Sequence, residues 1–225
     1  MAENPKLVGS RIVDCNPQDG PCPMQCPECF WLHRGPEAQK PYFPTAEEAR
    51  GKVVRVNSRH DSNLQREMVI AETARYPHRF FNTSIPRFDF PGPVMFTCNG
   101  RRPIRVECPP NVMAVRVRVS TWTAAEAEDL ANFYSAQGVP VIITFMRYRE
   151  LASIPMQNRG DYEWGTYITT VYQMPTAAAK VKVMSRFRET GVRMCGTPWS
   201  PYCRDCENCW HLYWDCLRKQ KGVAR

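Results

Sequence analysis

The stretch that decides the fold is Val112-Met-Ala-Val-Arg-Val-Arg-Val-Ser120, together with the segment that follows it up to Phe145. Its β-branched residues favour a strand. Thr123-Ala-Ala-Glu126 then fits a capping box, in which side chains satisfy backbone N–H groups at the start of a helix. The helix places four apolar residues on one face, at Ala127, Leu130, Ala131 and Tyr134. Gly138 ends the helix and residues 139–145 form a second strand, so the stretch predicts a strand-helix-strand unit.

The same alternation of strands and helices continues outside this unit. Runs rich in β-branched and aromatic residues predict further strands at residues 11–15, 53–57, 80–84, 94–97 and 167–172. Two more capping boxes, Thr45-Ala-Glu-Glu48 and Ser62-Asn-Leu-Gln65, predict helices that begin there. The alternation predicts an α/β fold, either a partial (β/α) barrel or an open, mostly parallel sheet, with cysteine-rich loops at both ends.

A parallel sheet also predicts where a functional site lies. The carboxyl ends of parallel strands meet at one edge, and ligand-binding side chains gather there. We therefore expect one shared face for the loops after Asp14, Asn57, Thr97, Ser120 and Phe145.

The bulk composition is typical of one globular domain inside a cell. With 225 residues and 43% hydrophobic content, the chain is long enough for one core, so we expect a single α/β domain over residues 1–225. Residues 195–225 are expected to form a cysteine-rich carboxyl-terminal extension of that domain. No signal-peptide core or membrane-length apolar run is visible, so we expect a cytoplasmic protein that does not contact a membrane.

Eleven cysteines in a reducing compartment indicate metal binding or catalysis rather than disulfides. The first group follows the first predicted strand and comprises Cys15, Cys22, Cys26 and Cys29. Its core spacing is C-x3-C-x2-C. Thiolates held this closely in a proline-rich loop repel one another, and a shared cation or cluster relieves that repulsion.

The second group lies near the other end of the chain and comprises Cys195, Cys203, Cys206 and Cys209. Its C-x2-C-x2-C core matches the first three ligands of a bacterial ferredoxin run, with Cys195 as the remote fourth ligand. Zinc is usually bound by two separated C-x2-C pairs. We therefore expect two [4Fe–4S] clusters, one at each group, with zinc as the alternative metal.

The C-x3-C-x2-C loop after a first strand, with α/β alternation behind it, resembles the radical S-adenosylmethionine superfamily. By that resemblance Cys22, Cys26 and Cys29 would hold a cubane by three irons. S-adenosylmethionine would bind the fourth iron and, on receiving an electron, yield a 5′-deoxyadenosyl radical. An electron donor such as flavodoxin or ferredoxin is implied, and the substrate is not specified.

The resemblance also implies residues that bind S-adenosylmethionine. No Gly-Gly-Glu follows the second strand here, and the available substitutes for the methionine amine are Asn57, Ser58 and Asp61. Arg118 and Ser120, at the end of another strand, would hold the carboxylate and the ribose.

The chain also looks like the phage family called gene product eighty-eight, whose activity is undefined. The residues that carry this likeness are Cys15 through Cys26, Arg55-Val-Asn-Ser-Arg-His-Asp61 and Cys203-Arg-Asp-Cys206-Glu-Asn-Cys209-Trp210. That family's pattern would make Cys15, Cys22 and Cys26 the ligands, so the choice of three among the four stays open. The likeness implies a bacterial or phage-infected cell.

Two classes of function follow from these patterns. The first is a radical S-adenosylmethionine-like enzyme with an auxiliary cluster near the carboxyl terminus. The second is a protein whose fold is stabilised by zinc or by a closed cluster, in which every iron has a protein ligand. Such a protein would transfer electrons or bind nucleic acid. Nucleic-acid binding would use the net charge of +8, with Arg101, Arg102, Arg147 and Tyr148 as candidate contacts.

Overall fold

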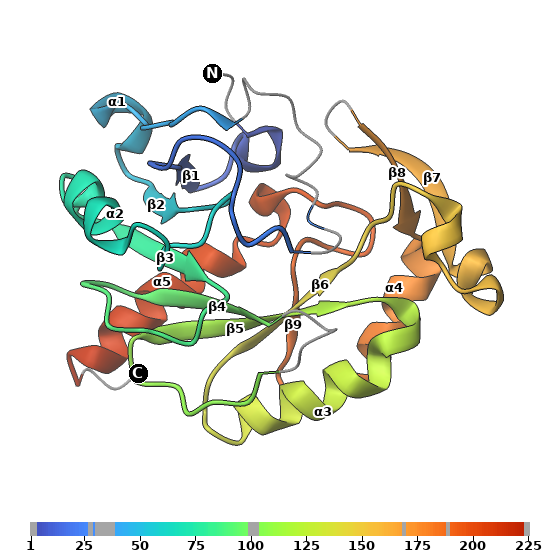
Figure 1. Cartoon of the computed structure of the whole chain (residues 1–225). Coiled ribbons are helices and arrows are strands. Elements are labelled where there is room, and N and C mark those ends of the chain that lie inside the picture. The colour runs from blue at the N-terminus through green and yellow to red at the C-terminus, as the bar shows by residue number, and fades with distance from the viewer. Residues whose placement is uncertain are drawn as a thin grey trace.

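A computed structural model describes residues 4–26, 29, 39–98, 104–167, 170–187 and 190–222. Within these residues, seven strands form one sheet in which every neighbouring pair is parallel (Figure 1). In sheet order they are β1 (Ile12–Cys15), β2 (Val53–Val56), β3 (Arg79–Thr83), β4 (Val94–Cys98), β5 (Val112–Val119), β6 (Val141–Phe145) and β9 (Arg193–Met194). The sheet curls into an open half-barrel, which confirms the predicted α/β fold with a partial barrel.

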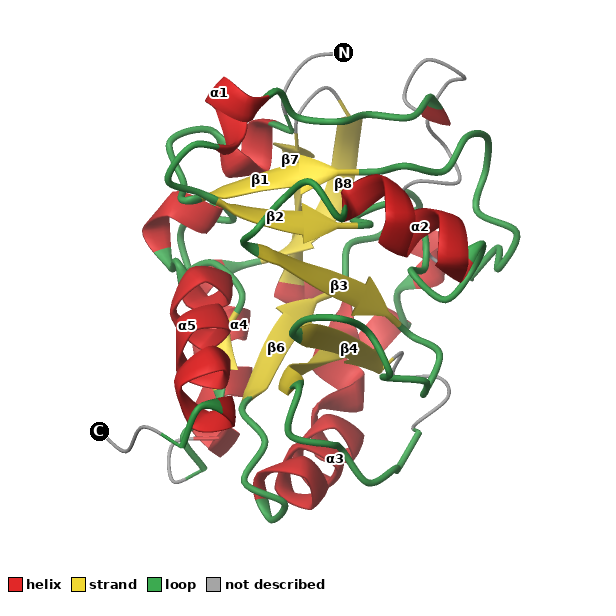
Figure 2. Cartoon of the chain, turned by 90° about the vertical axis from the view of Figure 1, so that its left-hand side faces the viewer, coloured by secondary structure: helices red, strands yellow, loops and turns green. Residues whose placement is uncertain are grey.

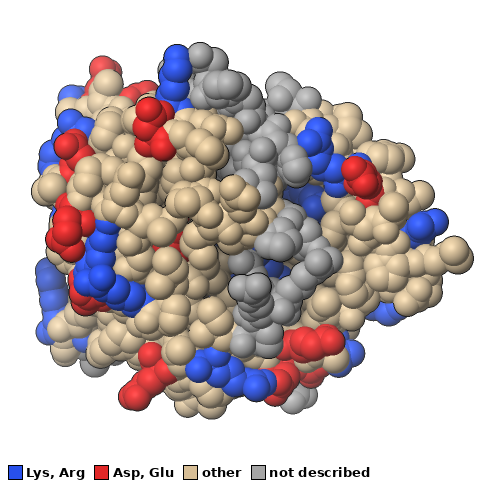
Figure 3. All heavy atoms as spheres, in the orientation of Figure 1, with Lys and Arg blue, Asp and Glu red and all other residues tan. Residues whose placement is uncertain are grey.

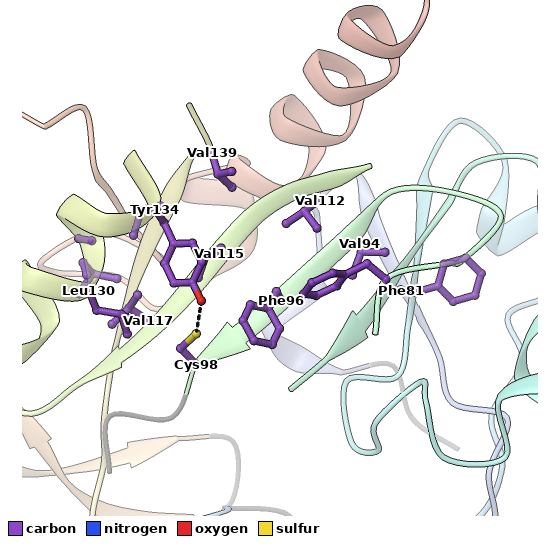
Figure 4. Close-up of a cluster of buried hydrophobic side chains, with 14 of the residues drawn as sticks. Phe81, Val94, Phe96, Cys98, Val112, Val115, Val117, Leu130, Tyr134 and Val139 are labelled. Carbon is purple, nitrogen blue, oxygen red and sulfur yellow. Dashed lines mark hydrogen bonds between the residues drawn. The ribbon is translucent and has the colours of Figure 1, made fainter. Parts of the chain in front are cut away.

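The outer, convex face of the sheet packs against helices and holds the larger apolar core. The helices are α2 (Arg66–Thr73), α3 (Ala124–Ser135) and α4 (Ala177–Met184). Figure 4 shows this core around Phe96, Cys98 and Tyr134, where the Cys98 thiol lies 3.7 Å from the Tyr134 hydroxyl. The four apolar residues predicted for one face of the α3 helix are all buried, and Gly138 has the positive φ of +71° expected at a helix end.

The inner, concave face is apolar where the strands begin. The helix α5 (Asn208–Gln220) covers this part of the sheet (Figure 2). Leu212, Tyr213 and Cys216 of α5 share a buried cluster with early strand residues such as Ile12 and Phe80. This helix therefore closes the barrel at its amino-terminal end and leaves the opposite end open.

The prediction of a single strand over residues 167–172 is wrong. The structure has an antiparallel hairpin outside the main sheet, with strands β7 (Tyr162–Tyr167) and β8 (Thr170–Pro175). A small cluster of Met146, Tyr148, Ile154 and Tyr162 packs this hairpin region together. The seventh strand of the sheet is β9, which has only two residues and was too short to be predicted from composition.

The predicted helix starts are confirmed to different degrees. Thr45 forms a complete capping box with Glu48 at α1 (Ala46–Ala49). Ser62 caps no helix, because α2 begins four residues later at Arg66, after Gln65 in a left-handed conformation. Thr123 precedes α3 as predicted, but its hydroxyl bonds to the Ser120 backbone and not to the helix.

Short 3-10 helices complete the structure at Pro5–Leu7, Thr121–Thr123, Leu151–Ser153, Met156–Asp161, Ser185–Phe187 and Cys203–Asp205. In the part of the chain that the structure describes, no helix combines the length and the apolar character needed to cross a membrane. On the face shown in Figure 3, the described Lys and Arg side chains lie interspersed with Asp and Glu. Among the described residues on that face, the basic side chains therefore form no continuous stripe.

Candidate functional site

A cavity of about 290 Å³ lies on the inner face of the sheet, toward the carboxyl ends of the strands. This volume is near the lower end of the size range of small-molecule sites. Cysteines from both ends of the chain line it, namely Cys22, Cys26, Cys29, Cys195, Cys203, Cys206 and Cys209. The structure thus brings both cysteine groups to one cavity.

The alternation of side chains along the strands explains why the cavity is polar above an apolar floor. Successive residues of a strand point to opposite faces, so every second residue of each strand points inward. On β2 the inward residues run from buried apolar Val53 to Arg55, and on β3 from Phe80 to Asn82. The apolar residues pack under α5, while the polar residues that follow line the cavity.

The loop after β1 presents the first three thiols at this cavity. Backbone hydrogen bonds fold it tightly, from the Gln25 N–H to the Cys22 carbonyl (3.3 Å) and from the Cys29 N–H to the Cys26 carbonyl (3.1 Å). Gln25 has a φ of +40°, which is strained for a residue with a side chain. Burial raises the pKa of Cys22, although backbone groups of Met24 and Asp61 that hydrogen-bond the thiol favour its charged form.

Cys15 lies apart from these three thiols. It is the last residue of β1 and is fully buried in the outer core, in the same cluster as Tyr76. Burial raises its pKa to about 12, so the thiol stays protonated. The side chain therefore points to the convex face, away from the cavity.

The second cysteine group lies deeper in the cavity, against the apolar residues that pack under α5. Cys195 directly follows β9 and its N–H bonds to the Ile143 carbonyl (2.8 Å), while Cys209 lies in the first turn of α5. Glu207, between Cys206 and Cys209, has a φ of +43°. Like Gln25, it is a non-glycine residue in a left-handed conformation inside a cysteine motif, which is typical of a functional constraint.

Cations surround this second group. The Lys6 ammonium lies 3.4 Å from the Cys195 sulfur, as a hydrogen-bond donor. Burial alone would raise the pKa of Cys195, but Lys6, Arg116 and Arg55 outweigh it and lower the pKa to about 7. The surroundings of Cys195 therefore favour the thiolate, the form that binds metal.

Thiols are donors that both zinc and iron–sulfur clusters take, and the two differ in how they arrange those thiols. Among the described residues, no group of three or more His, Cys, Asp or Glu side chains is close enough to hold one metal ion. A zinc ion would draw its thiolates together through Zn–S bonds of about 2.3 Å. In a cubane each thiolate binds a different iron, so the sulfurs are farther apart. Seven thiols line one cavity here, and Lys6, Arg55 and Arg116 lie near Cys195.

Of the five residues predicted to bind S-adenosylmethionine, four line the cavity and one does not. Asn57, Ser58, Asp61 and Arg118 line the cavity. Ser120 is buried, does not belong to the lining, and its hydroxyl bonds to that of Tyr148. Asn57 follows β2 with a φ of +63°, an uncommon conformation for a residue with a side chain, at the edge where ligands are expected.

Each carboxylate oxygen of Asp61 already accepts two hydrogen bonds within the protein. Its two carboxylate oxygens accept bonds from the hydroxyl of Thr83 (2.7 Å), the N–H of Asn63 (3.0 Å), and the N–H and hydroxyl of Ser84 (2.6 and 2.9 Å). These bonds tie the end of β3 to the loop after β2. The contacts made by Asp61 therefore account for its burial without a ligand.

Several residues in the cavity were not predicted as site residues. Arg55 lines the cavity and forms a buried ion pair at 2.6 Å with Asp14, which does not belong to the lining. Asn82, Arg116 and Thr144 also line the cavity. The signal that could have found all five is the period of two along each strand, counted from the apolar residues that face inward.

The candidate nucleic-acid contacts do not form one surface among the described residues. Arg101 and Arg102 lie outside the described residues. Arg147 lines the cavity, and Tyr148 is buried with its ring stacked on Trp122 at 5.3 Å between centroids. Tyr148 is therefore not available to stack on a base.

No family model, curated protein or solved structure matches this chain.

Proposed function

We propose that this protein is a radical S-adenosylmethionine-like iron–sulfur enzyme. The first cluster would be held by Cys22, Cys26 and Cys29. The second, auxiliary cluster would be held by Cys195, Cys203, Cys206 and Cys209. The observation that carries the proposal is that both cysteine groups line one cavity at the carboxyl ends of an all-parallel half-barrel.

The choice of the first triplet is supported by the position of Cys15. A side chain buried in the outer core, with a pKa of about 12, is a poor metal ligand. A cluster with three thiolate ligands, when bound, supplies one iron with an open coordination position and an electron. Three ligands at the cavity therefore favour an enzyme over a closed electron-transfer site.

The remaining residues of the cavity would bind and orient the second cofactor. Asn57 and Ser58, after β2, lie at the same end of the barrel as the first cysteine loop. Ser58 is held by its hydroxyl, which donates to Asp14 (2.9 Å). Arg118 supplies a positive charge for a carboxylate. The half-barrel walls and α5 would keep water from the reacting atoms.

The test is purification without oxygen, reconstitution with iron and sulfide, chemical reduction, and assay of S-adenosylmethionine cleavage to 5′-deoxyadenosine. We expect cleavage by the wild-type protein, none by Cys26→Ala, and partial activity in Cys206→Ala. Cys108→Ala is the matched control, because this thiol packs beside the outer core and not at the cavity. Full iron content without any deoxyadenosine would reject the radical reaction and leave a closed-cluster protein. Colourless protein with stoichiometric zinc would reject both clusters.

A further inference from the structure

Two arginines on the inner face of the sheet differ in how their charges are balanced. Arg55 forms an ion pair with Asp14 at 2.6 Å, and Asp14 accepts further bonds from Asn4 and Ser58. Arg116, on β5, makes one long bond to the Thr97 hydroxyl (3.5 Å). Among the described residues it has no carboxylate partner, and the anionic groups that its charge favours there are the Cys195 and Cys209 thiolates. A partly buried guanidinium without a carboxylate partner attracts an anion.

Unsatisfied polar atoms lie on the strands around Arg116. Asn82, on β3, is only 6% exposed, and its amide nitrogen donates to the Val56 carbonyl (3.1 Å). Its amide oxygen has no partner among the described residues, and the same holds for the Thr144 hydroxyl on β6. All three side chains belong to the lining of the cavity, and the two unpartnered atoms, which are buried, would gain partners from a ligand that binds against this wall and shifts their side chains toward it.

The charges of the residues that line the cavity also favour an anionic ligand. The described lining includes six Lys and Arg residues, of which Arg55 is paired with Asp14 and Lys6 bonds to the Cys195 sulfur, and two acids, Asp61 and Glu207. Asp61 is saturated by hydrogen bonds, and Glu207 pairs with Arg11 at 3.3 Å. A concave site with an excess of one charge concentrates ligands of the opposite charge.

We propose that Arg116, Asn82 and Thr144 form the substrate-binding site, and that the substrate is a small anion with a carboxylate or phosphate and at least one N–H or O–H donor. Arg116 and the Thr144 hydroxyl bind the anionic group, while the Asn82 amide oxygen accepts the donor. The strands that carry Asn82 and Arg116 are two interstrand spacings apart, roughly 10 Å. The ligand therefore spans several bonds between its anionic group and its donor. This assignment of a substrate site rests on the proposed function, whereas anion binding itself does not.

The test measures anion binding in the full chain, purified without oxygen, in the absence of S-adenosylmethionine. The probes are inorganic phosphate and succinate, and the readout is the rise in melting temperature relative to chloride at equal ionic strength. We expect at least one probe to stabilise the protein and its dissociation constant to rise at least fivefold in Arg116→Gln. Arg105→Gln is the matched control, because Arg105 is exposed and pairs with Asp129. The stronger of the two probes distinguishes a phosphate from a carboxylate.

A second variant covers the case in which Arg116→Gln does not fold. Thr144→Val keeps the shape and removes a buried, unpartnered hydroxyl, so the unliganded protein should be as stable or more stable. We expect it to weaken probe binding at least threefold. Wild-type binding in both variants, or a change confined to iron content in Arg116→Gln, would overturn the inference and leave Arg116 as a counter-charge for the thiolates. Anion binding without S-adenosylmethionine cleavage would reject only the proposed function.

Discussion

The two cysteine segments have similar spacings but lie in different surroundings. Cys22, Cys26 and Cys29 are half-buried in a loop at the cavity. Cys203 is buried, and Cys195 and Cys209 pack against the apolar cluster under α5, with Lys6, Arg55 and Arg116 nearby. A cluster that reacts with a cofactor needs access, whereas an auxiliary cluster needs shielding and a tuned charge. Under the proposed function, this difference suits a reactive role for the first segment and a supporting role for the second.

The largest expected difference between the segments is in stability when each loses its metal. Cys22→Ala and Cys206→Ala should each remove about half of the roughly eight irons expected for two cubanes. Cys206→Ala should also lower stability by roughly 3 kcal/mol, or about 10 °C in Tm, because metal binding is coupled to the folding of the segment that closes the barrel. Iron analysis and calorimetry on the same samples check this. Equal losses of Tm in the two variants would contradict the proposed difference in burial.

A matched pair of glycines tests the same comparison without touching a ligand. Gly20 lies in the first segment and Gly196 in the second, with φ of +74° and +80°. A Cβ on Gly20 would meet no atom within 4 Å, whereas a Cβ on Gly196 would lie 2.5 Å from the Ser200 carbonyl oxygen. We expect Gly20→Ala to cost about 1 kcal/mol and Gly196→Ala about 3 kcal/mol, since the second adds a backbone clash to the same strained φ. Chemical denaturation measures both values, and similar costs would show that the second segment is not tightly packed.

The smallest expected effect concerns Cys15. Cys15→Ala should leave the iron content and the visible spectrum unchanged, because the side chain lies in the outer core. Removal of one buried sulfur should cost about 1–2 kcal/mol of stability. Cys29→Ala is the contrasting variant, with expected loss of about half the iron. Loss of iron in Cys15→Ala, with retention in Cys29→Ala, would exchange the roles of the two cysteines.

Local patterns predicted the parts of the fold that depend on short stretches of chain. Six of the predicted strands are β1 to β6, and the α3 helix buries the face that its spacing predicted. The helix at Ser62 was misplaced because that hydroxyl accepts a bond from the Asn57 amide after β2 instead of capping a turn. The segment over residues 167–172 was assigned to one strand because composition does not reveal a hairpin turn.

The same limit applies to the candidate site. The spacing of Cys22, Cys26 and Cys29 is visible in the chain, as is the group around Cys206. Their shared cavity is not visible, since it requires α5 to fold back under the sheet. The roles of Asp61 and Arg116 also depend on contacts between strands. Asp61 is saturated by Asn63 and by Thr83 and Ser84 at the end of β3, and among the described residues Arg116 lacks the carboxylate that Arg55 has.

The sequence by itself determined the alternation of strands and helices and the two cysteine spacings, because both depend on neighbours along the chain. Only the tertiary structure decided that Cys15 faces the outer core and that both cysteine groups face one cavity. The physical reason is the curl of the parallel sheet. The pleat of each strand already turns alternate side chains to opposite faces, and the curl makes one of these faces the concave face on which the two ends of the chain meet.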